Sequence, residues 1–167
     1  MRVPCRPVDA SFFDAAPMRF QNVVELQASP ARVFALFEDP KSWPEWFRSI
    51  KKVVWTGNKP YAAGTTRTVW LTGLTVDEYF FRWEQGRRFS FYFTATSLPL
   101  AHAFAEDYLL EEIAPGRTRF TYTVGIEPRL PLALGGPLSR MYFASMFKSG
   151  CTNLARYVLK LEPPAPA

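Results

Sequence analysis

The sequence predicts an α+β protein in which a seven-stranded antiparallel sheet curves around a long C-terminal helix. Three observations lead to this fold class. A strand-like segment near the N-terminus is followed by two short helical segments, six segments with a two-residue period come next, and helical spacing returns near the C-terminus. A chain of 167 residues is most simply one domain with a sizeable core.

The first elements are a leader and an edge strand. Residues 1–18 are rich in proline and show no periodicity, so we expect an N-terminal leader. The alternation in Arg19–Gln27 predicts the first strand. We expect a single domain over residues 19–162, followed by a proline-rich tail at 163–167.

Two short helices are expected next, in the stretch "SPARVFALFEDPKSWPEWFRSI". Ser29 is a favourable N-cap with Pro30 at the first helical position, and Asp39-Pro40 ends this helix. A second short helix covers about residues 41–48, so the two form a V. The segment is crowded with aromatic rings but contains no obvious nucleophile, base or metal ligand.

Six further strands and one long helix complete the pattern. The strands are expected at 51–56, 65–72, 75–84, 87–97, 101–113 and 117–127, between turn-forming sequences such as "TG", "QG" and "APG". From about residue 131 to 161, apolar residues recur at helical spacing: Phe143, Phe147, Cys151, Leu154, Val158 and Leu161.

In this order the elements resemble the START-like or SRPBCC superfamily, the helix-grip fold of birch-pollen allergens, lipid-transfer domains and polyketide cyclase/dehydrase-type proteins. The local matches are "ASPARVFALFEDPKSWPEWF", "GTTRTVWL", "EYFFRWEQGRRFSF", "GRTRFTYTV" and the C-terminal helix, together about residues 20–161. The resemblance implies a ligand cavity between sheet and helix, closed at one end by the two short helices. None of the motifs identifies a particular activity.

The aromatic residues of the second short helix then have two interpretations. Trp43, Trp46 and Phe47 either form the end wall of the cavity or fill the core beneath the helical V. A small-molecule site of ordinary size leads us to expect a pocket of roughly 300–1,000 Å³.

The turn at residues 85–86 decides which face of the strand at 75–84 is buried. A two-residue turn makes three cross-strand pairs: Glu78 with Phe93, Phe80 with Phe91, and Arg82 with Phe89. A three-residue loop buries the alternate set: Tyr79, Phe81 and Trp83. We prefer the first arrangement, because members of the superfamily often carry an inward glutamate early on this strand.

The "APG" loop poses the same choice for the strand at 101–113. A three-residue loop with glycine in the left-handed conformation places four residues inward: Phe104, Glu106, Tyr108 and Leu110. A two-residue loop turns Asp107 and Glu111 inward, which uses apolar burial less well. We therefore expect Glu106 inside.

A carboxylate that faces an apolar cavity must be paired, hydrogen-bonded or protonated. Arg82, Tyr108 and Tyr122 are the partners we expect for Glu106, either as an internal salt bridge that fixes the sheet or as polar groups that orient a ligand. The predicted ligand-binding residues are Trp46, Glu78, Phe80, Arg82, Phe91, Phe93, Phe104, Glu106, Tyr108, Tyr122, Phe143 and Phe147. No residue is assigned a catalytic role.

Composition limits the partners. One histidine and two distant cysteines offer no metal-ligand spacing, so no metal or other cofactor is expected. The net charge of +5 comes from scattered basic residues, which does not favour nucleic acid. Without a signal peptide or an apolar run long enough to span a bilayer, we expect a cytoplasmic location and no stable membrane insertion. The oligomeric state is left open.

Three functions remain, in order of preference. The first is binding or transport of a hydrophobic or aromatic small molecule, lipid-like or polyketide-like. The second is a cyclase or dehydratase in which Glu106, Tyr108 and Arg82 polarise a carbonyl and move a proton. The third is an interaction module for nucleic acid or protein, suggested by basic and aromatic residues in "RRFSFYF" and disfavoured by their alternation onto opposite faces.

Overall fold

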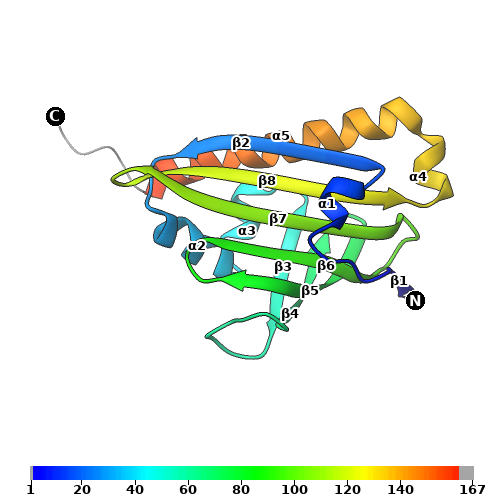
Figure 1. Ribbon diagram of the computed structural model, residues 1–167, viewed down its shortest axis with the longest axis horizontal. Coiled ribbons are helices and arrows are strands. Elements are labelled where there is room, and N and C mark those ends of the chain that lie inside the picture. The colour runs from blue at the N-terminus through cyan, green and yellow to red at the C-terminus, as the bar shows by residue number, and fades with distance from the viewer. Residues whose placement is uncertain (1, 162–167) are drawn as a thin grey trace.

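The computed structural model describes residues 2–161 and shows a curved antiparallel sheet that wraps around one long helix (Figure 1). The strands follow the order β2-β8-β7-β6-β5-β4-β3, and a short strand β1 pairs with β6 off this path. Apart from the β2–β8 and β1–β6 pairs, neighbours in the sheet are consecutive in sequence, as in a meander. The predicted fold class is confirmed.

The strands lie close to their predicted positions. Their bounds are β2 (Met18–Leu26), β3 (Ile50–Thr56), β4 (Thr66–Leu71), β5 (Leu74–Glu84), β6 (Arg88–Thr96), β7 (Ala101–Ala114) and β8 (Arg117–Pro128). Inward phenylalanines alternate along β6, where Phe89, Phe91 and Phe93 are all buried.

The predicted helical V is present at one end of the sheet (Figure 1). Helix α2 (Pro30–Glu38) begins after Ser29, whose hydroxyl accepts a hydrogen bond of 3.4 Å from the Arg32 N–H. Helix α3 (Trp43–Trp46) is shorter than the predicted 41–48. The Trp43 indole donates to the Phe37 carbonyl at 2.9 Å and so fastens α3 to the end of α2.

The C-terminal region forms two helices rather than one. Helix α4 (Leu130–Leu134) and helix α5 (Gly136–Leu161) are separated at Gly135-Gly136, where Gly136 has a φ of 46°. This left-handed conformation is easy only for glycine and ends the first helix. Helix α5 lays its buried face against the sheet, and at Gly150 an added Cβ would lie 3.0 Å from the Phe47 ring, so the helix approaches the α3 segment closely. Within residues 2–161, no helix combines the length and hydropathy that crossing a bilayer requires.

The segment expected to be a leader packs onto the sheet. Strand β1 (Val3–Pro4) pairs with the end of β6, and the N–H groups of Cys5 and Arg6 donate to the Thr94 and His102 carbonyls at 2.9 and 2.7 Å. Helix α1 (Phe12–Ala15) covers the outer face of β7 and β8. The predicted proline-rich tail lies outside the described residues.

The hairpin between β5 and β6 has a three-residue loop instead of the two-residue turn that we preferred. Glu84 pairs with Arg88 across residues 85–87. Near the loop, Trp83 therefore lies opposite Phe89 and packs against the core.

A β-bulge between Phe80 and Arg82 then changes the register. The extra residue exchanges the two faces of β5, because successive side chains point to opposite sides. Beyond the bulge the strand makes two of the predicted pairs: Phe80 with Phe91, and Glu78 with Phe93. Arg82 lies between the bulge and the loop, and it pairs with Ser90. The prediction that Arg82 points inward is therefore wrong.

The β7–β8 hairpin reaches the predicted register by a different route. Ala114 pairs with Arg117, which leaves a two-residue turn, and a bulge between Glu112 and Ala114 adds the residue that a longer loop was expected to supply. Leu110 therefore lies opposite Phe120, and Glu106 faces inward as expected.

Candidate ligand-binding cavity

A partly enclosed cavity of about 80 Å³ lies between the inner face of the sheet, α3 and the N-terminal half of α5. Most of its wall is apolar, and the polar atoms come from the charged side chains of Arg67, Glu78 and Glu106 together with Thr96 and Tyr108. The cavity is smaller than the expected 300–1,000 Å³, because aromatic rings occupy most of the space between sheet and helix.

Eight of the twelve predicted ligand-binding residues line this cavity: Glu78, Phe91, Phe93, Phe104, Glu106, Tyr108, Phe143 and Phe147. Phe80 and Tyr122 are buried but lie behind the wall. Trp46 is also buried away from the cavity, whereas Trp43 and Phe47 line it. The second short helix thus provides both an end wall and a core plug, through different residues.

Arg67 on β4 is the central cation of the cavity, although it was not among the predicted ligand-binding residues. Its side chain is 2% exposed and its Nε donates to Glu78 Oε2 on the neighbouring strand. The guanidinium carbon lies 4.4–5.1 Å from the centroids of four aromatic rings: Trp43, Trp55, Phe80 and Phe91. These contacts combine an ion pair with cation–π attraction at a desolvated site.

The sequence did contain a signal for Arg67. In "GTTRTVWL", Arg67 alternates with Val69 and Leu71, and both of these line the cavity. The tight turn after Leu71 pairs Arg67 directly with Glu78. A buried glutamate that requires a cation, together with that register, identifies Arg67 as its partner.

Glu106 lies beside this ion pair and is held by two tyrosines. Its Oε2 accepts hydrogen bonds from the Tyr108 and Tyr122 hydroxyls, each at 2.9 Å. Burial and the nearby Glu78 carboxylate raise the pKa of Glu106 to about 7, against the opposing effects of the two hydroxyls and Arg67. Near neutral pH this carboxyl group therefore exists in both protonation states.

Burial also raises the pKa of Glu78, although the charge of Arg67 opposes the shift. The pKa values of Tyr108 and Tyr122 lie well above their usual value, because both hydroxyls are buried beside Glu106. The two tyrosines therefore remain neutral hydrogen-bond donors over the physiological pH range.

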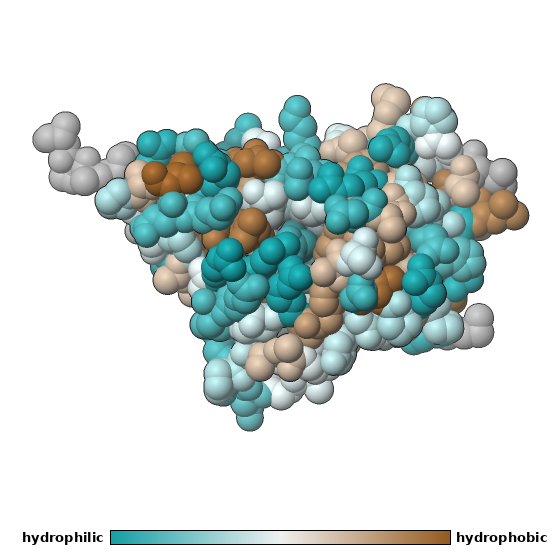
Figure 2. Space-filling view, in the orientation of Figure 1, coloured by the Kyte–Doolittle hydropathy of each residue, from teal (hydrophilic) through white to brown (hydrophobic). Residues whose placement is uncertain are grey.

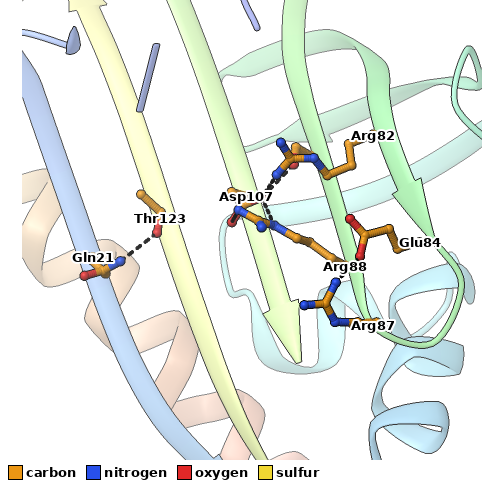
Figure 3. A network of polar contacts seen from close by, with 8 residues as sticks. Gln21, Arg82, Glu84, Arg87, Arg88, Asp107 and Thr123 are labelled. Atoms are coloured by element: carbon orange, nitrogen blue, oxygen red, sulfur yellow. Dashed lines mark hydrogen bonds and ion pairs between the residues drawn. The ribbon is translucent and has the colours of Figure 1, made fainter. Parts of the chain in front are cut away.

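Arg82 belongs to a different network, on the outer face of the sheet (Figure 3). Asp107 accepts two hydrogen bonds from Arg88, at 2.9 and 3.1 Å, and one from the Ser90 hydroxyl at 2.6 Å. Arg82 lies 3.7 Å from the same carboxylate, turned away from the cavity. The expected pairing of Arg82 with Glu106 is therefore wrong, and Arg67–Glu78 is the buried ion pair of the interior.

The polar group formed by Arg67, Glu78 and Glu106 contains a buried donor that makes no hydrogen bond to the part of the chain that the structure describes. Nη1 of Arg67 is buried and has no hydrogen-bond partner within the described residues, and the Arg67 side chain lines the cavity. A protonated Glu106 adds a second donor at the same wall. Residues 2–161 contain no cluster of three His, Cys, Asp or Glu side chains suited to a metal ion. The arrangement suits an apolar molecule that carries a hydrogen-bond acceptor.

Comparison with known proteins agrees with this fold. Residues 17–159 match the family model described as polyketide cyclase / dehydrase and lipid transport. An uncharacterised protein of Mycobacterium tuberculosis is 43% identical over 122 residues, which cover 72% of this chain and 72% of the relative.

Two solved structures illustrate the structural similarity. A START superfamily protein from Mycobacterium smegmatis has a TM-score of 0.72 at 14% identity, over 86% of this chain and 99% of its own. The Zhui aromatase/cyclase from Streptomyces sp. R1128 has a TM-score of 0.68 at 11% identity, over 89% of this chain and 98% of its own. At these identities the solved structures establish the fold alone. The family match over residues 17–159 confirms the superfamily resemblance seen in the sequence.

The buried ion pair gives a stability prediction. Arg67→Met leaves the Glu78 carboxylate without its cation, so we expect the free energy of unfolding at pH 7 to fall by about 3–5 kcal/mol. Replacing both charges with Arg67→Met/Glu78→Leu should recover most of that loss. Urea denaturation followed by circular dichroism measures both. The exposed pair Arg87–Glu84 is the matched control, and its removal should cost less than about 1 kcal/mol. A double variant as unstable as Arg67→Met would contradict the prediction.

Glu106 gives a pH prediction. Its pKa is about 7 in the folded chain and 4.5 when unperturbed. The unfolded chain therefore loses this proton first, and the free energy of unfolding falls as the pH rises from about 4.5 to 7, by on the order of 3 kcal/mol. Glu106→Gln removes this dependence, so the variant should gain stability relative to the native chain as the pH rises. Denaturation curves between pH 4.5 and 8.5 test this, and a constant difference between the two proteins would refute it.

Proposed function

Because the chain belongs to the polyketide cyclase / dehydrase and lipid transport family, we propose that it binds a hydrophobic small molecule in the cavity between the sheet and α5. One observation carries the proposal. An apolar cavity is closed at its inner wall by a buried arginine whose Nη1 has no hydrogen-bond partner within residues 2–161. Buried donors are normally paired, so an unpaired donor on a residue of the cavity wall favours a ligand that carries a hydrogen-bond acceptor.

The wall chemistry defines the class of ligand. Phe91, Phe93, Phe104 and Phe147 offer flat apolar surfaces, which favour an aromatic or alkyl body. The Arg67 Nη1 donor favours a carbonyl, hydroxyl or other oxygen acceptor at one end of that body. A few convergent polar groups in an apolar pocket fix the orientation of such a ligand.

The cavity must enlarge to accept a molecule of this kind. About 80 Å³ holds only several water molecules. The side of the wall formed by Leu132, Phe143 and Met146 belongs to α4 and α5, which are joined at the Gly135-Gly136 break. Outward movement of this corner enlarges the cavity without disturbing the sheet.

Filling the cavity tests the binding proposal. Val76 is fully buried on the cavity wall, so Val76→Phe places a ring in the free space and should abolish ligand retention, at a cost of about 1–3 kcal/mol in stability. Native mass spectrometry of protein purified from its own source measures the retained molecule. Val54→Phe, at a half-exposed position of β3, is the control and should bind normally. No retained molecule on the native chain, or equal retention by both variants, would contradict the proposal.

A second candidate function is catalysis of a cyclisation or dehydration, favoured by the pKa of about 7 at Glu106. A carboxyl group with a pKa near the working pH is suited to proton transfer, and the neighbouring Arg67 would polarise a carbonyl.

Glu106→Gln separates the two functions. In a binding protein the change alters only hydrogen bonding, weakens affinity by about 1–3 kcal/mol and removes no chemistry. In an enzyme it leaves binding nearly intact, while turnover of a polyketide-like substrate falls about a hundredfold or more. Titration calorimetry and product analysis on the same variant distinguish these results.

A further inference from the structure

Large apolar side chains are exposed around the start of α5. Leu130, Leu138, Met141 and Tyr142 are 71%, 74%, 68% and 65% exposed, and Leu98 on the β6–β7 loop is 45% exposed. This loop lies beside α4, because the Arg129 N–H donates to the Leu100 carbonyl at 2.9 Å. We call these five residues the apolar crest. Hydrophobic colouring is visible at the α4 end of the molecule in Figure 2.

The apolar crest lies beside the α4 end of the cavity wall. Four of the five crest residues lie within two positions of a residue that lines the cavity: Leu98 near Leu100, Leu130 near Leu132, and Met141 and Tyr142 near Phe143. Exposed apolar clusters on soluble proteins usually mark a surface that is covered in function. Whatever covers the crest therefore lies next to the cavity wall.

The outer face of α5 continues from the crest as a basic surface. Leu138, Tyr142, Ser145, Ser149, Thr152 and Arg156 recur at helical spacing opposite the buried face. Helix α5 contains Arg140, Lys148, Arg156 and Lys160 but no Asp or Glu. Toward the C-terminal end of the helix, the carboxylates of Glu45 and Asp39 act on Tyr157.

A shallow groove of about 410 Å³ runs along this face. We call it the cationic groove, and its walls are Arg48, Ser145, Lys148, Ser149, Thr152, Asn153 and Arg156. A second hollow extends toward the crest past Tyr142 and Met146, and it shares four residues with the groove: Arg48, Ser145, Ser149 and Asn153. Cations, hydroxyls and an amide, without a carboxylate, suit anionic phosphate groups.

We propose that the apolar crest and the cationic groove together dock this protein onto an anionic lipid bilayer. Helix α5 lies along the surface, with Leu138, Met141 and Tyr142 inserted among the acyl chains and Lys148 and Arg156 at the headgroups. At 1.5 Å per residue, Lys148 lies about 15 Å along the axis from Leu138, so a helix parallel to the surface brings both regions into contact. This docking does not depend on the ligand proposed above.

Charge decides between possible occupants. A second copy of the chain would bring two basic faces together, which repel. A nucleic acid would leave the apolar crest without a partner. An anionic bilayer satisfies both parts, because acyl chains take the apolar side chains and each Lys or Arg near the headgroups adds attraction.

Vesicle flotation tests the proposal with the full chain. At roughly 0.1 M salt, we expect the protein to bind vesicles of phosphatidylcholine that contain about 30% phosphatidylserine. Binding to vesicles of phosphatidylcholine alone should be much weaker. Leu138→Ser and Lys148→Glu should each lower the partition constant about tenfold or more. Tyr142→Ser should lower the partition constant as much as Leu138→Ser, and it replaces Leu138→Ser as the test if that variant does not fold.

Matched changes elsewhere provide the controls. Val23→Ser removes an apolar side chain that is 59% exposed on β2, and Arg19→Glu reverses an exposed charge on the same strand. Both should bind vesicles like the native chain. The proposal is overturned if the protein ignores anionic vesicles, if it binds neutral and anionic vesicles equally, if the controls lose as much as the crest and groove variants, or if duplex DNA displaces it from the vesicles.

Discussion

Arg67 brings a positive charge into the centre of the molecule, where Glu78 and four aromatic rings take the place of water. The rings come from α3, β3, β5 and β6, so this one side chain ties the helical V to three strands. Its charge also stabilises the ionised form of Glu106, while the charge of Glu78 opposes ionisation. Burial has the largest effect on the pKa of Glu106, and the two charges of the Arg67–Glu78 pair act on it in opposite directions.

Element order was predictable because hydrophobic period and turn residues act locally. The strands, the V of helices and the inward position of Glu106 all followed from such signals. The orientation of Arg82 did not, because a bulge at Phe80–Arg82 exchanges the faces of β5 between its two ends. The residue types in "YFFRW" do not predict this bulge, since aromatic side chains occur on both faces of the segment. The pairing of Arg67 with Glu78 could have been predicted, because the turn after Leu71 fixes the register that places them opposite each other.

The two ends of the cavity differ in how firmly they are closed. At the α3 end, rings of Phe37, Trp43 and Trp46 lie within 6.0 Å of one another, and Gly150 lets α5 approach Phe47. At the α4 end, the helices are separated by a glycine pair and carry exposed apolar side chains. The fold thus joins a tightly packed end to one where a glycine pair interrupts the helical wall and apolar side chains are exposed.

The N-terminal segment fills a gap in the sheet. Strands β6 and β7 pair only as far as Tyr92 and Ala105, and beyond that point residues 3–6 bond to both of them. Without these residues, the backbone groups of Thr94 and His102 would face solvent unpaired inside an otherwise continuous sheet. Unpaired strand backbone is a template for strand addition, so removal of the segment would expose a site for aggregation.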